Sequence, residues 1–599
     1  MELNAEQRRA VEAVRGPVCI LAGAGTGKTT TITHRIAGQV QSGEFRPNQI
    51  LAVTFTDKAA GELRSRLEAL GSPGVTARTF HAAALGQLHD YAPDRVGRIL
   101  SSKALPLRRI ANSLPGAYRF RPAADLATEI EWAKNRRITP ARYRAEVGGH
   151  EPPIPPDLMR RVFAEYEKRK AAAGYVDFED LLELAVQLYS TDEAALASIR
   201  ERFRAFTVDE YQDVNLLQQT LLDLWLGPRH ELCVVGDDYQ SIYAFTGASP
   251  EHLLAMPKRF PQAQVIRLEE NYRSSPQVLE LANRLVPKLG GAEKVLRATQ
   301  PEGPAPRLEP CSDEAAHAVE QIRALGIPYD EVAILCRTNA RLADFEEALH
   351  AAGIPAQGSS FLGRESARYV LRRLASPADV RRLAKERGWA ENPPDKLGER
   401  EVVRQNDLAR LVRLADEYAD LDGPAFVAEL ERRFGNGGEA RRGVHLLTLH
   451  GAKGLEFEAV FLPHLEAKEL PSRQAKTAAQ VDEERRLLYV GLTRAKRHLF
   501  VTWTRMPSRF LAELGFAARK AAPSPEPDDP TFAALKRWRL ERARADQVPA
   551  YVVFHNSTLA EIAGRKPRTL GDLATVPGVG PAKLGRYGDD LLAALAATA

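Results

Sequence analysis

From Val18 to Thr30 the chain reads VCILAGAGTGKTT, and this stretch decides the fold. An apolar, β-branched run is followed by a glycine-rich turn, and Lys28 and Thr29 open a helical pattern. The backbone N–H groups of such a turn cradle phosphates, while the lysine reaches the β- and γ-phosphates and the threonine hydroxyl binds Mg²⁺. The strict pattern has Gly where Ala22 stands. The alternative, a chance lysine after a flexible turn, is disfavoured by the preceding strand pattern.

A second segment, FTVDEYQD at residues 206–213, places two carboxylates after an apolar run. Nucleotide hydrolysis needs a carboxylate for the metal and a group that orients or deprotonates the attacking water. We predict that Asp209, together with Thr29, holds Mg²⁺ and that Glu210 acts on the water. Most Asp-Glu pairs are exposed charges or helix caps, so this prediction depends on the presence of the nucleotide-binding turn.

Short β-branched runs alternate along the chain with helical stretches rich in Ala, Leu, Arg and Glu. This alternation predicts an α/β fold with parallel sheets built from βαβ units. The runs are too many for one sheet, so we expect two α/β cores that meet near residue 270. The predicted strands are Val18–Leu21, Ile50–Phe55, Phe206–Val208, Leu232–Val235, Val265–Leu268, Val332–Cys336, Val444–Leu449, Ala459–Leu462 and Leu499–Trp503.

The segments between these runs divide the chain further. Two of them contain helical patterns and proline clusters but few strand signals, and we predict one helical insertion into each core. The segment AAPSPEPDDP cannot bury much surface and indicates an extended linker. The predicted parts are a first core (1–84 and 184–269) with its insertion (85–183), a second core (270–370 and 443–515) with its insertion (371–442), a linker (516–530) and a helical unit (531–599).

Length and composition limit the class of protein. At 599 residues the chain exceeds what one hydrophobic core supports, and 44% hydrophobic with 27% charged residues is typical of a globular protein. No run approaches the ~18–20 apolar residues that span a membrane, and no secretory signal pattern opens the chain. We predict a cytoplasmic protein. The cysteines, three of them in apolar runs, match no zinc or disulfide spacing: Cys19, Cys233, Cys311 and Cys336.

An ordered series of motifs between about residues 3 and 514 resembles that of the superfamily 1 helicases of the UvrD/Rep/PcrA family. The resemblance implies two RecA-like P-loop cores that bind Mg-ATP between them, and helical insertions that the family calls 1B and 2B. Residues 371–442 leave a reduced 2B, because this insertion is normally much larger in the family. The resemblance therefore implies an ATP-driven motor with an altered second insertion.

The resemblance also assigns residues to the nucleotide. Gln7 of LNAEQ is expected to bond the adenine, Arg35 of THR and Tyr272 of NYRS to stack on it, and Glu456 of TLHGAKGLEF to bind the ribose. The expected phosphate cradle consists of Gly23, Ala24, Gly25, Thr26, Gly27, Lys28, Thr29 and Thr30.

Three further residues are implied to sense the γ-phosphate. They are Gln240 of GDDYQSIYAFTGA, Arg273 of NYRS, and Arg494 of ERRLLYVGLTRAK, which would be an arginine finger from the second core. Two basic residues on a core other than the one that carries Lys28 would draw the cores together around the nucleotide. An ordinary surface ion pair is the alternative for Arg494.

For nucleic acid, the expected contacts follow the ends of predicted strands. Hydroxyls there can hold phosphates, while aromatic faces stack bases without reading sequence. For Phe80, the alternative to a DNA contact is burial in the hydrophobic core. Asp57 stands where the family usually has Asn, and Thr246 where many members have Arg, so one phosphate contact is expected to be altered. The expected contacts are Phe55, Thr56, Lys58, Thr79, Phe80, His81, Tyr243, Phe245, Thr448 and His450.

The last part of the chain resembles the helicase-and-RNase-D C-terminal (HRDC) domain over roughly residues 531–599. It holds ten Lys and Arg against six Asp and Glu, which suggests a polyanionic partner. Its segment VPGVGPAKLGRYG is expected to form a tight turn that brings Lys583 and Arg586 near a phosphate. The alternative is a packing turn without a ligand.

Together these motifs predict an ATP- and Mg²⁺-dependent 3′-to-5′ DNA helicase of repair or recombination, with single-stranded and tailed duplex DNA as partners and no membrane. A translocase that strips proteins with little unwinding, the motor half of a helicase–nuclease and a signalling P-loop ATPase are the alternatives. No nuclease-like carboxylate and lysine pattern follows residue 515, and the aromatic DNA contacts disfavour a signalling role.

Overall fold

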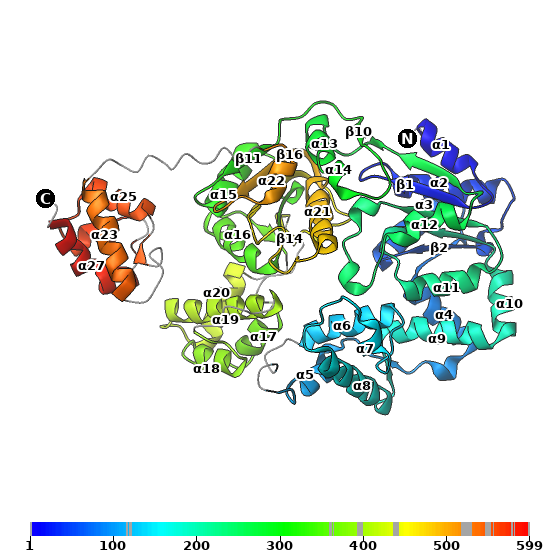
Figure 1. Ribbon diagram of the computed structural model, residues 1–599, viewed down its shortest axis with the longest axis horizontal. Helices are drawn as coiled ribbons and strands as arrows, with labels where there is room; N and C mark the ends of the chain where they lie inside the picture. Colours follow the sequence, from blue (N-terminus) through cyan, green and yellow to red (C-terminus); the bar gives the residue numbers. More distant parts are fainter. Residues whose placement is uncertain are drawn as a thin grey trace. The chain divides into compact units, whose positions relative to one another are not determined.

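The computed structural model describes residues 3–115, 118, 123–358, 362, 364–391, 399–434, 442–516, 530–545, 553–554, 556–576, 579 and 581–596. The chain forms two compact units, Met1–Phe516 and Ala517–Ala599. Figure 1 shows the two sheets of the first unit and the all-helical second unit, which are described separately here.

The first sheet has six parallel strands in the order β3-β2-β6-β7-β1-β8. In register, Val18 of β1 lies between Cys233 of β7 and Gln264 of β8. Strands β1, β2 and β7 are buried along their whole length, as expected of a parallel sheet covered on both faces. The strands are β1 (Val18–Ala22), β2 (Ile50–Thr54), β3 (Thr76–Thr79), β6 (Ala205–Val208), β7 (Leu232–Gly236) and β8 (Gln264–Leu268).

Alternate residues of these strands point into two different apolar layers, one on each face of the sheet. Val18 and Ile20 of β1 pack with one set of helices, whereas Cys19 and Leu21 pack with the other. The first set consists of α1 (Ala5–Glu12), α2 (Lys28–Gln41) and α3 (Asp57–Ala69). The second set consists of α4 (Phe80–Tyr91), α9 (Phe178–Thr191), α10 (Glu193–Arg202), α11 (Leu216–Leu226) and α12 (Glu251–Arg259). We call this assembly the first core.

The second sheet also has six parallel strands, in the order β11-β16-β15-β12-β14-β13. They are β11 (Arg307–Pro310), β12 (Val332–Cys336), β13 (Ala356–Gln357), β14 (Val444–Thr448), β15 (Phe457–Leu462) and β16 (Ala495–Trp503). One face packs on α13 (Pro276–Asn283), α14 (Val286–Leu289), α21 (Ala478–Leu492) and α22 (Arg509–Glu513), and the other on α15 (Glu314–Leu325) and α16 (Asn339–Ala351). We call this assembly the second core.

All nine strand positions predicted from the sequence are strands, and the α/β class with parallel sheets is confirmed. Strands β3, β11 and β13 were missed because they are short or polar: β3 reads TART and β13 has two residues. A two-stranded pair, β9 (Glu270–Asn271) and β10 (Arg297–Ala298), lies between the two sheets in the sequence.

Each core carries a helical insertion with apolar residues of its own. The first insertion has its own apolar cluster between Leu107 and Tyr166. The second insertion has one between Leu362 and Leu430. The first contains β4 (Arg98–Ile99), α5 (Ala104–Ala111), α6 (Ala123–Asn135), α7 (Tyr143–Glu146), α8 (Pro156–Ala172) and β5 (Tyr175–Val176). The second contains α17 (Glu365–Leu371), α18 (Asp379–Glu386), α19 (Glu399–Glu417) and α20 (Gly423–Phe434).

A buried cluster of charges fastens the first insertion to the first core. Asp177, which caps α9, accepts bonds from Lys134 of α6 at 2.6 Å and from Lys170 and Tyr166 of α8 at 3.2 and 2.9 Å. Burial alone would raise the pKa of Asp177, but the charges of Lys134 and Lys170 outweigh it and hold that pKa well below its usual range. Since buried ion pairs are costly to break from one side, this cluster fixes α6 relative to α9.

The second unit is a small helical domain, as predicted. It consists of α23 (Pro530–Ala545), α25 (Asn556–Arg565), α26 (Leu570–Ala574) and α27 (Pro581–Ala596), which share one apolar core. Lys583 lies 5.3 Å from the centre of the Phe554 ring and Arg586 lies 5.4 Å from that of Tyr587. Most of the glycine-containing turn predicted before Lys583, and nearly all of the predicted linker, lie outside the described residues.

Two predictions from composition can be compared with the described residues. Cys19, Cys233 and Cys336 are free thiols buried in β1, β7 and β12, as expected. Within the described ranges, no helix combines the length and the apolar character that crossing a membrane requires.

Phe80 belongs to the core, and the nucleic-acid contact predicted for it is wrong. Its side chain is 2% exposed and stacks on Trp225 with ring centres 6.0 Å apart and planes 7° apart. The ring therefore packs between α4 and α11, inside the face where Phe206 stacks on the same Trp225.

We therefore expect Phe80→Ala to lower the free energy of unfolding of the first unit by about 3–5 kcal/mol, because it removes a buried ring. Urea unfolding followed by circular dichroism measures this loss. Phe55→Ala is the matched control, since Phe55 is only half-buried, and it should cost less. A Phe80→Ala protein with unchanged stability but weaker DNA binding would restore the original assignment.

Candidate nucleotide and nucleic-acid sites

The glycine-rich turn joins the end of β1 to the first residue of α2, Lys28. Gly25 and Gly27 adopt φ values of 66° and 76°, a left-handed conformation that favours glycine. A Cβ on Gly27 would lie 2.7 Å from Nε2 of Gln7, and one on Gly25 would lie 2.7 Å from the Arg273 side chain. The turn is thus closely covered from two sides and leaves the N-terminus of α2 for an anion.

Gln7 and Tyr272 lie beside this turn. Asn4 caps α1 and accepts a bond from the Gln7 backbone N–H at 2.7 Å, while its side chain donates to the Tyr272 hydroxyl at 2.9 Å. The Gln7 amide donates to the Thr26 carbonyl oxygen at 3.0 Å. The structure therefore brings together two of the predicted adenine contacts, and Asn4, which sequence reasoning missed, holds them.

Arg35 does not fit the stacking role predicted for it. Its guanidinium is buried and donates from Nε to the Ala13 carbonyl oxygen at 3.0 Å. Because the side chain holds α1 against α2, it has no open face for a base. The residue is structural, and its motif gave no signal of burial.

The predicted pair of carboxylates lies at the same sheet edge as the turn. Lys28 Nζ lies 3.6 Å from Oε1 of Glu210, whose backbone adopts a left-handed φ of 50° that is rare for a non-glycine residue. Burial raises the pKa of Asp209, and the adjacent charge of Glu210 raises it further. Burial would also raise the pKa of Glu210, but Lys28 and Lys453 outweigh it and lower that pKa. Glu210 is therefore the charged member of the pair.

The oxygen atoms of Thr29 and Asp209 suit a hard cation such as Mg²⁺. Within the described part of the chain, the Thr29 hydroxyl has no hydrogen-bond partner, and Asp209 accepts only the Glu210 backbone N–H, at 2.9 Å. Two neighbouring half-buried carboxylates repel each other, which a divalent cation would offset. The donor set therefore fits the group that the sequence implies.

Gln212, which sequence reasoning missed, orients Glu210. Its Nε2 donates to Oε2 of Glu210 at 2.5 Å, and its Oε1 accepts the Asp237 backbone N–H at 2.9 Å. A Cβ on Gly236 would lie 2.5 Å from that Oε1, so the end of β7 must be glycine for Gln212 to fit.

Arg494 reaches across from the second core to the first. It is 2% exposed, donates to Gln240 Oε1 at 3.1 Å and to the Leu455 carbonyl oxygen at 3.0 Å. Burial lowers its pKa to about 9, and the nearby charge of Arg273 adds to this effect. Among the described residues it forms no ion pair. A buried cation without a carboxylate partner is poised for an anionic ligand.

Arg273 and Glu456 lie at the same junction. Arg273 donates to Glu456 Oε2 at 2.6 Å and to the Thr493 carbonyl oxygen at 3.2 Å. Burial would raise the pKa of Glu456, but Arg273 outweighs it and lowers that pKa. All three residues predicted to sense the γ-phosphate, with Glu456, therefore meet where the two cores face each other.

Two lysines that sequence reasoning missed hold Gln240. Lys453, from the loop after β14, donates to the Gln240 carbonyl oxygen at 2.7 Å and forms an ion pair with Asp213. Lys294 is 2% exposed and lies 3.1 Å from Oδ1 of Asp237, whose Oδ2 accepts a bond from the Gln240 side chain at 2.6 Å. Their partners are distant in sequence, so no local pattern marked these lysines.

An aromatic cluster spans the two cores. Tyr243 and Phe245 come from the first core, with ring centres 6.0 Å apart, and His450 of the second core lies 5.7 Å from Phe245. Phe245 is 43% exposed. Burial lowers the pKa of His450 to about 3, with contributions from Arg337 and Lys453, so this ring is neutral near pH 7. We call these three rings the aromatic seam.

The loop that carries Phe245 is fixed from both sides. Its Ala244 N–H donates to Glu483 of α21 at 2.9 Å, and Asn135 of α6 donates to the Thr246 carbonyl oxygen at 2.8 Å. The Thr246 hydroxyl donates back to the Tyr243 carbonyl oxygen at 2.8 Å. The seam is thereby connected to the second core and to the first insertion.

The remaining predicted DNA contacts lie at strand ends. Thr56 and Thr79 cap α3 and α4 by accepting backbone N–H groups at 3.1 Å, and each hydroxyl keeps its hydrogen for donation. Lys58 is exposed, and Thr448 accepts the Gly451 N–H at 3.1 Å. Burial lowers the pKa of His81 to about 4, so this ring is also neutral.

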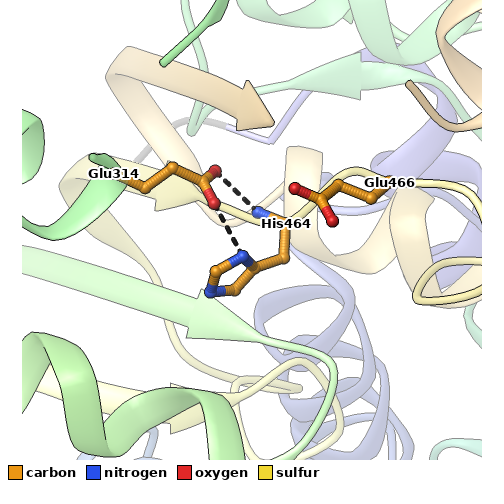
Figure 2. Close-up of side chains that lie close together, drawn as sticks. All are labelled: Glu314, His464 and Glu466. Atoms are coloured by element: carbon orange, nitrogen blue, oxygen red, sulfur yellow. Dashed lines mark hydrogen bonds and ion pairs between the residues drawn. The ribbon is translucent and has the colours of Figure 1, made fainter. Parts of the chain in front are cut away.

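A second cluster of residues of the kinds that bind metal ions lies at the end of β15 (Figure 2). It consists of Glu314, His464 and Glu466. Glu314 accepts the His464 N–H at 2.9 Å, lies 2.6 Å from Nδ1 of that ring and accepts the Thr502 hydroxyl at 2.6 Å. Glu466 accepts the Thr504 N–H at 2.7 Å. Because these bonds tie the loop after β15 to β16 and α15, the cluster has a structural role.

Comparison with known families and proteins agrees with this geometry. A model of the UvrD/REP helicase N-terminal domain matches residues 3–261, and one of the UvrD-like helicase C-terminal domain matches residues 266–416 and 378–506. A model of the HRDC domain matches residues 529–595.

Three curated relatives are similar over most of their length. ATP-dependent DNA helicase UvrD2 of Mycobacterium tuberculosis is 40% identical over 98% of this chain and 97% of its own. ATP-dependent DNA helicase Rep of Escherichia coli is 30% identical over 86% of this chain and 94% of its own. ATP-dependent DNA helicase PcrA of Bacillus subtilis is 28% identical over 86% and 85%.

We expect Lys28→Ala to abolish nucleotide hydrolysis and Glu210→Gln to retain nucleotide binding but stop turnover. The reason is that positioning and electrostatics supply most phosphoryl-transfer catalysis. ATP binding and steady-state ATPase assays separate the two effects. Glu201→Gln, an exposed carboxylate on α10, is the control and should behave as the parent. Turnover near the parent rate in Glu210→Gln would refute its assigned role.

Proposed function

The chain belongs to the UvrD/Rep/PcrA-type family of ATP-dependent DNA helicases, and on this premise we propose that it moves 3′-to-5′ along single-stranded DNA and unwinds duplex DNA. Its second unit is an HRDC domain. The observation that best supports the proposed motor is the buried Arg494 guanidinium, which lacks a carboxylate partner among the described residues and bonds to Gln240 of the opposite core.

In this proposal, ATP lies between the cores with its phosphates on the glycine-rich turn. Lys28 neutralises the phosphate charge, and Glu210, held by Gln212, orients the attacking water. Thr29 and Asp209 would hold Mg²⁺, which supplies electrophilic stabilisation of the phosphate oxygens. Gln7 and Tyr272 are the proposed adenine contacts and Glu456 the proposed ribose contact.

We infer that closure of the cores depends on the γ-phosphate. Arg494, Arg273 and Gln240 present two cations and an amide to the space opposite Lys28, so a γ-phosphate would bind both cores and its loss would release them. Arg494 would then act as an arginine finger. The same residues are connected to the aromatic seam, because Lys453 bonds Gln240 and lies 5.0 Å from the centre of the Tyr243 ring.

The seam is the proposed contact for single-stranded DNA. Exposed rings stack bases without reading sequence, and the strand-end hydroxyls and Lys58 are suited to phosphates. The proposed contacts are Phe55, Thr56, Lys58, Thr79, His81, Tyr243, Phe245, Thr448 and His450. We further propose that the protein acts on the cytoplasmic nucleoid in repair or recombination.

A translocase that displaces proteins but unwinds poorly is the second candidate function. The reduced second insertion favours it, because the helices α17–α20 occupy only residues 365–434 and give duplex DNA a smaller surface. Unwinding per ATP hydrolysed distinguishes the two functions.

Unwinding of tailed substrates tests the proposal. We expect ATP-dependent strand separation of a duplex with a 3′ tail and at least tenfold less with a 5′ tail, since a translocating motor loads on the single strand in one polarity. The Lys28→Ala protein is the control and should unwind neither. Efficient unwinding from the 5′ tail would refute the polarity, and strong ATPase stimulation without unwinding would favour the translocase.

The HRDC domain is proposed to add DNA affinity. Removal of residues 521–599 should spare the ATPase activity, because the first unit is compact by itself, and should weaken DNA binding with a shallower dependence on salt. Titration of a tailed duplex at several salt concentrations measures both. An unchanged slope would mean that this domain binds protein or no ligand.

A further inference from the structure

A short connecting segment, residues 291–296, links helices of the second core to the first core. It follows α14, which packs in the second core, and leads into β10. A Cβ on Gly23 would clash with the Leu296 side chain, so this leucine covers the start of the glycine-rich turn. Val295 donates its backbone N–H to Oε1 of Glu269, which follows β8, at 3.0 Å. The segment is therefore held against the first core beside the proposed phosphate site.

The same segment meets the loop that follows β7. Gly291 has a φ of 79°, and a Cβ there would clash with the Asp238 carboxylate, so this close approach requires glycine. The Ala292 backbone N–H donates to Oδ2 of Asp238 at 2.9 Å. These contacts place Lys294 between two carboxylates, because its Nζ forms an ion pair with Asp238 and lies 3.1 Å from Oδ1 of Asp237.

Lys294 is buried as a charged group. Its side chain is 1% exposed, and its ammonium lies 3.5 Å from the centre of the Tyr239 ring. Burial alone would lower the pKa of Lys294, but the charges of Asp237 and Asp238 outweigh it and raise that pKa. The cation would be costly without its carboxylates, and the carboxylates would be costly without the cation. The three charged side chains therefore form one unit.

Asp237 connects this unit to Gln240. Its Oδ1 faces Lys294 and accepts the Tyr239 backbone N–H at 3.2 Å, while its Oδ2 accepts a bond from Nε2 of Gln240 at 2.6 Å. An ionised carboxylate only accepts hydrogen bonds, so Gln240 must direct its amide NH₂ group to Asp237. Its oxygen is then left for Arg494, which donates to it at 3.1 Å. The charge on Lys294 thereby decides which end of the Gln240 amide faces the second core.

We propose that Lys294 is a positioning residue for ATP hydrolysis, which holds Asp237 as an acceptor and thereby aims the Gln240 oxygen at Arg494. Without the ammonium, a protonated Asp237 can donate to Gln240 and hold the amide in the opposite orientation. An NH₂ group would then face a guanidinium that also has only donors. The inference rests on the proposed function, in which Gln240 and Arg494 sense the γ-phosphate.

The contacts of Lys294 indicate which kinetic constant it should affect. Its ammonium contacts Asp237, Asp238 and Tyr239, which are not assigned to the nucleotide. Its loss should therefore slow turnover rather than weaken ATP binding, because the phosphate cradle and the adenine contacts keep their own bonds.

Variants of the intact chain test this inference. Lys294→Met removes the charge and keeps an unbranched side chain, and Lys288→Met, at an exposed position on α14, is the matched control. Because Lys294→Met leaves two carboxylates without their cation, it is also combined with Asp238→Asn. This pair restores the net charge of the unit, and the asparagine oxygen can still accept the Ala292 N–H. Each protein is characterised by thermal unfolding and by kcat and KM for ATP at saturating single-stranded DNA.

Lys294→Met should lower kcat about a hundredfold, as the displacement of a catalytic group by about 1 Å does, and should change KM for ATP less than about twofold. The pair of Lys294→Met with Asp238→Asn should regain the unfolding temperature of the parent but keep the low kcat. Lys288→Met should match the parent in every assay. A pair that regains kcat together with stability would show that Lys294 serves only the fold.

A double-mutant cycle with Gln240 shows whether Lys294 acts through that residue. Gln240→Ala should itself lower kcat, and adding Lys294→Met should then lower it further by less than about twofold, because residues that act as one unit are not additive. Full additivity, or a parent-like kcat in Lys294→Met beside a slow Gln240→Ala, would overturn the inference and leave the proposed function standing. A parent-like Gln240→Ala protein would refute the assigned γ-phosphate sensor and this inference with it.

Discussion

The structure depends on one buried positive charge at the boundary between two α/β cores. Arg494 is enclosed by carbonyl and amide oxygens and bonds to Gln240 of the opposite core, while among the described residues no carboxylate pairs with it. Burial lowers its pKa, which reports the cost of keeping a guanidinium there without a partner anion. An anion that enters between the cores would remove this cost. The contact between the cores is therefore sensitive to charge rather than fixed by apolar packing alone.

This constraint explains why so many ionic bonds converge around Gln240. Lys453 approaches it from the second core, and Lys294 restrains it through Asp237. Lys294 is buried and the Lys453 side chain is only 9% exposed, so each needs its carboxylates. Those carboxylates fix the loops that follow the strands of the first sheet. A change of charge near Lys28 can then reach Tyr243 and the aromatic seam through bonded neighbours.

The sequence predicted the elements whose patterns are local. Nine strands, the glycine-rich turn and the acidic pair beside Lys28 follow from runs of a few residues, and the structure places the turn and the acidic pair at one edge of the first sheet. Residues whose role depends on distant partners gave no such signal, as Lys294, Lys453 and Gln212 illustrate. The roles predicted for Phe80 and Arg35 do not fit the structure for the same reason. Tertiary packing decides whether an aromatic or a cationic side chain faces a ligand or the protein interior. Here Phe80 packs on Trp225, and Arg35 bonds to the Ala13 carbonyl oxygen.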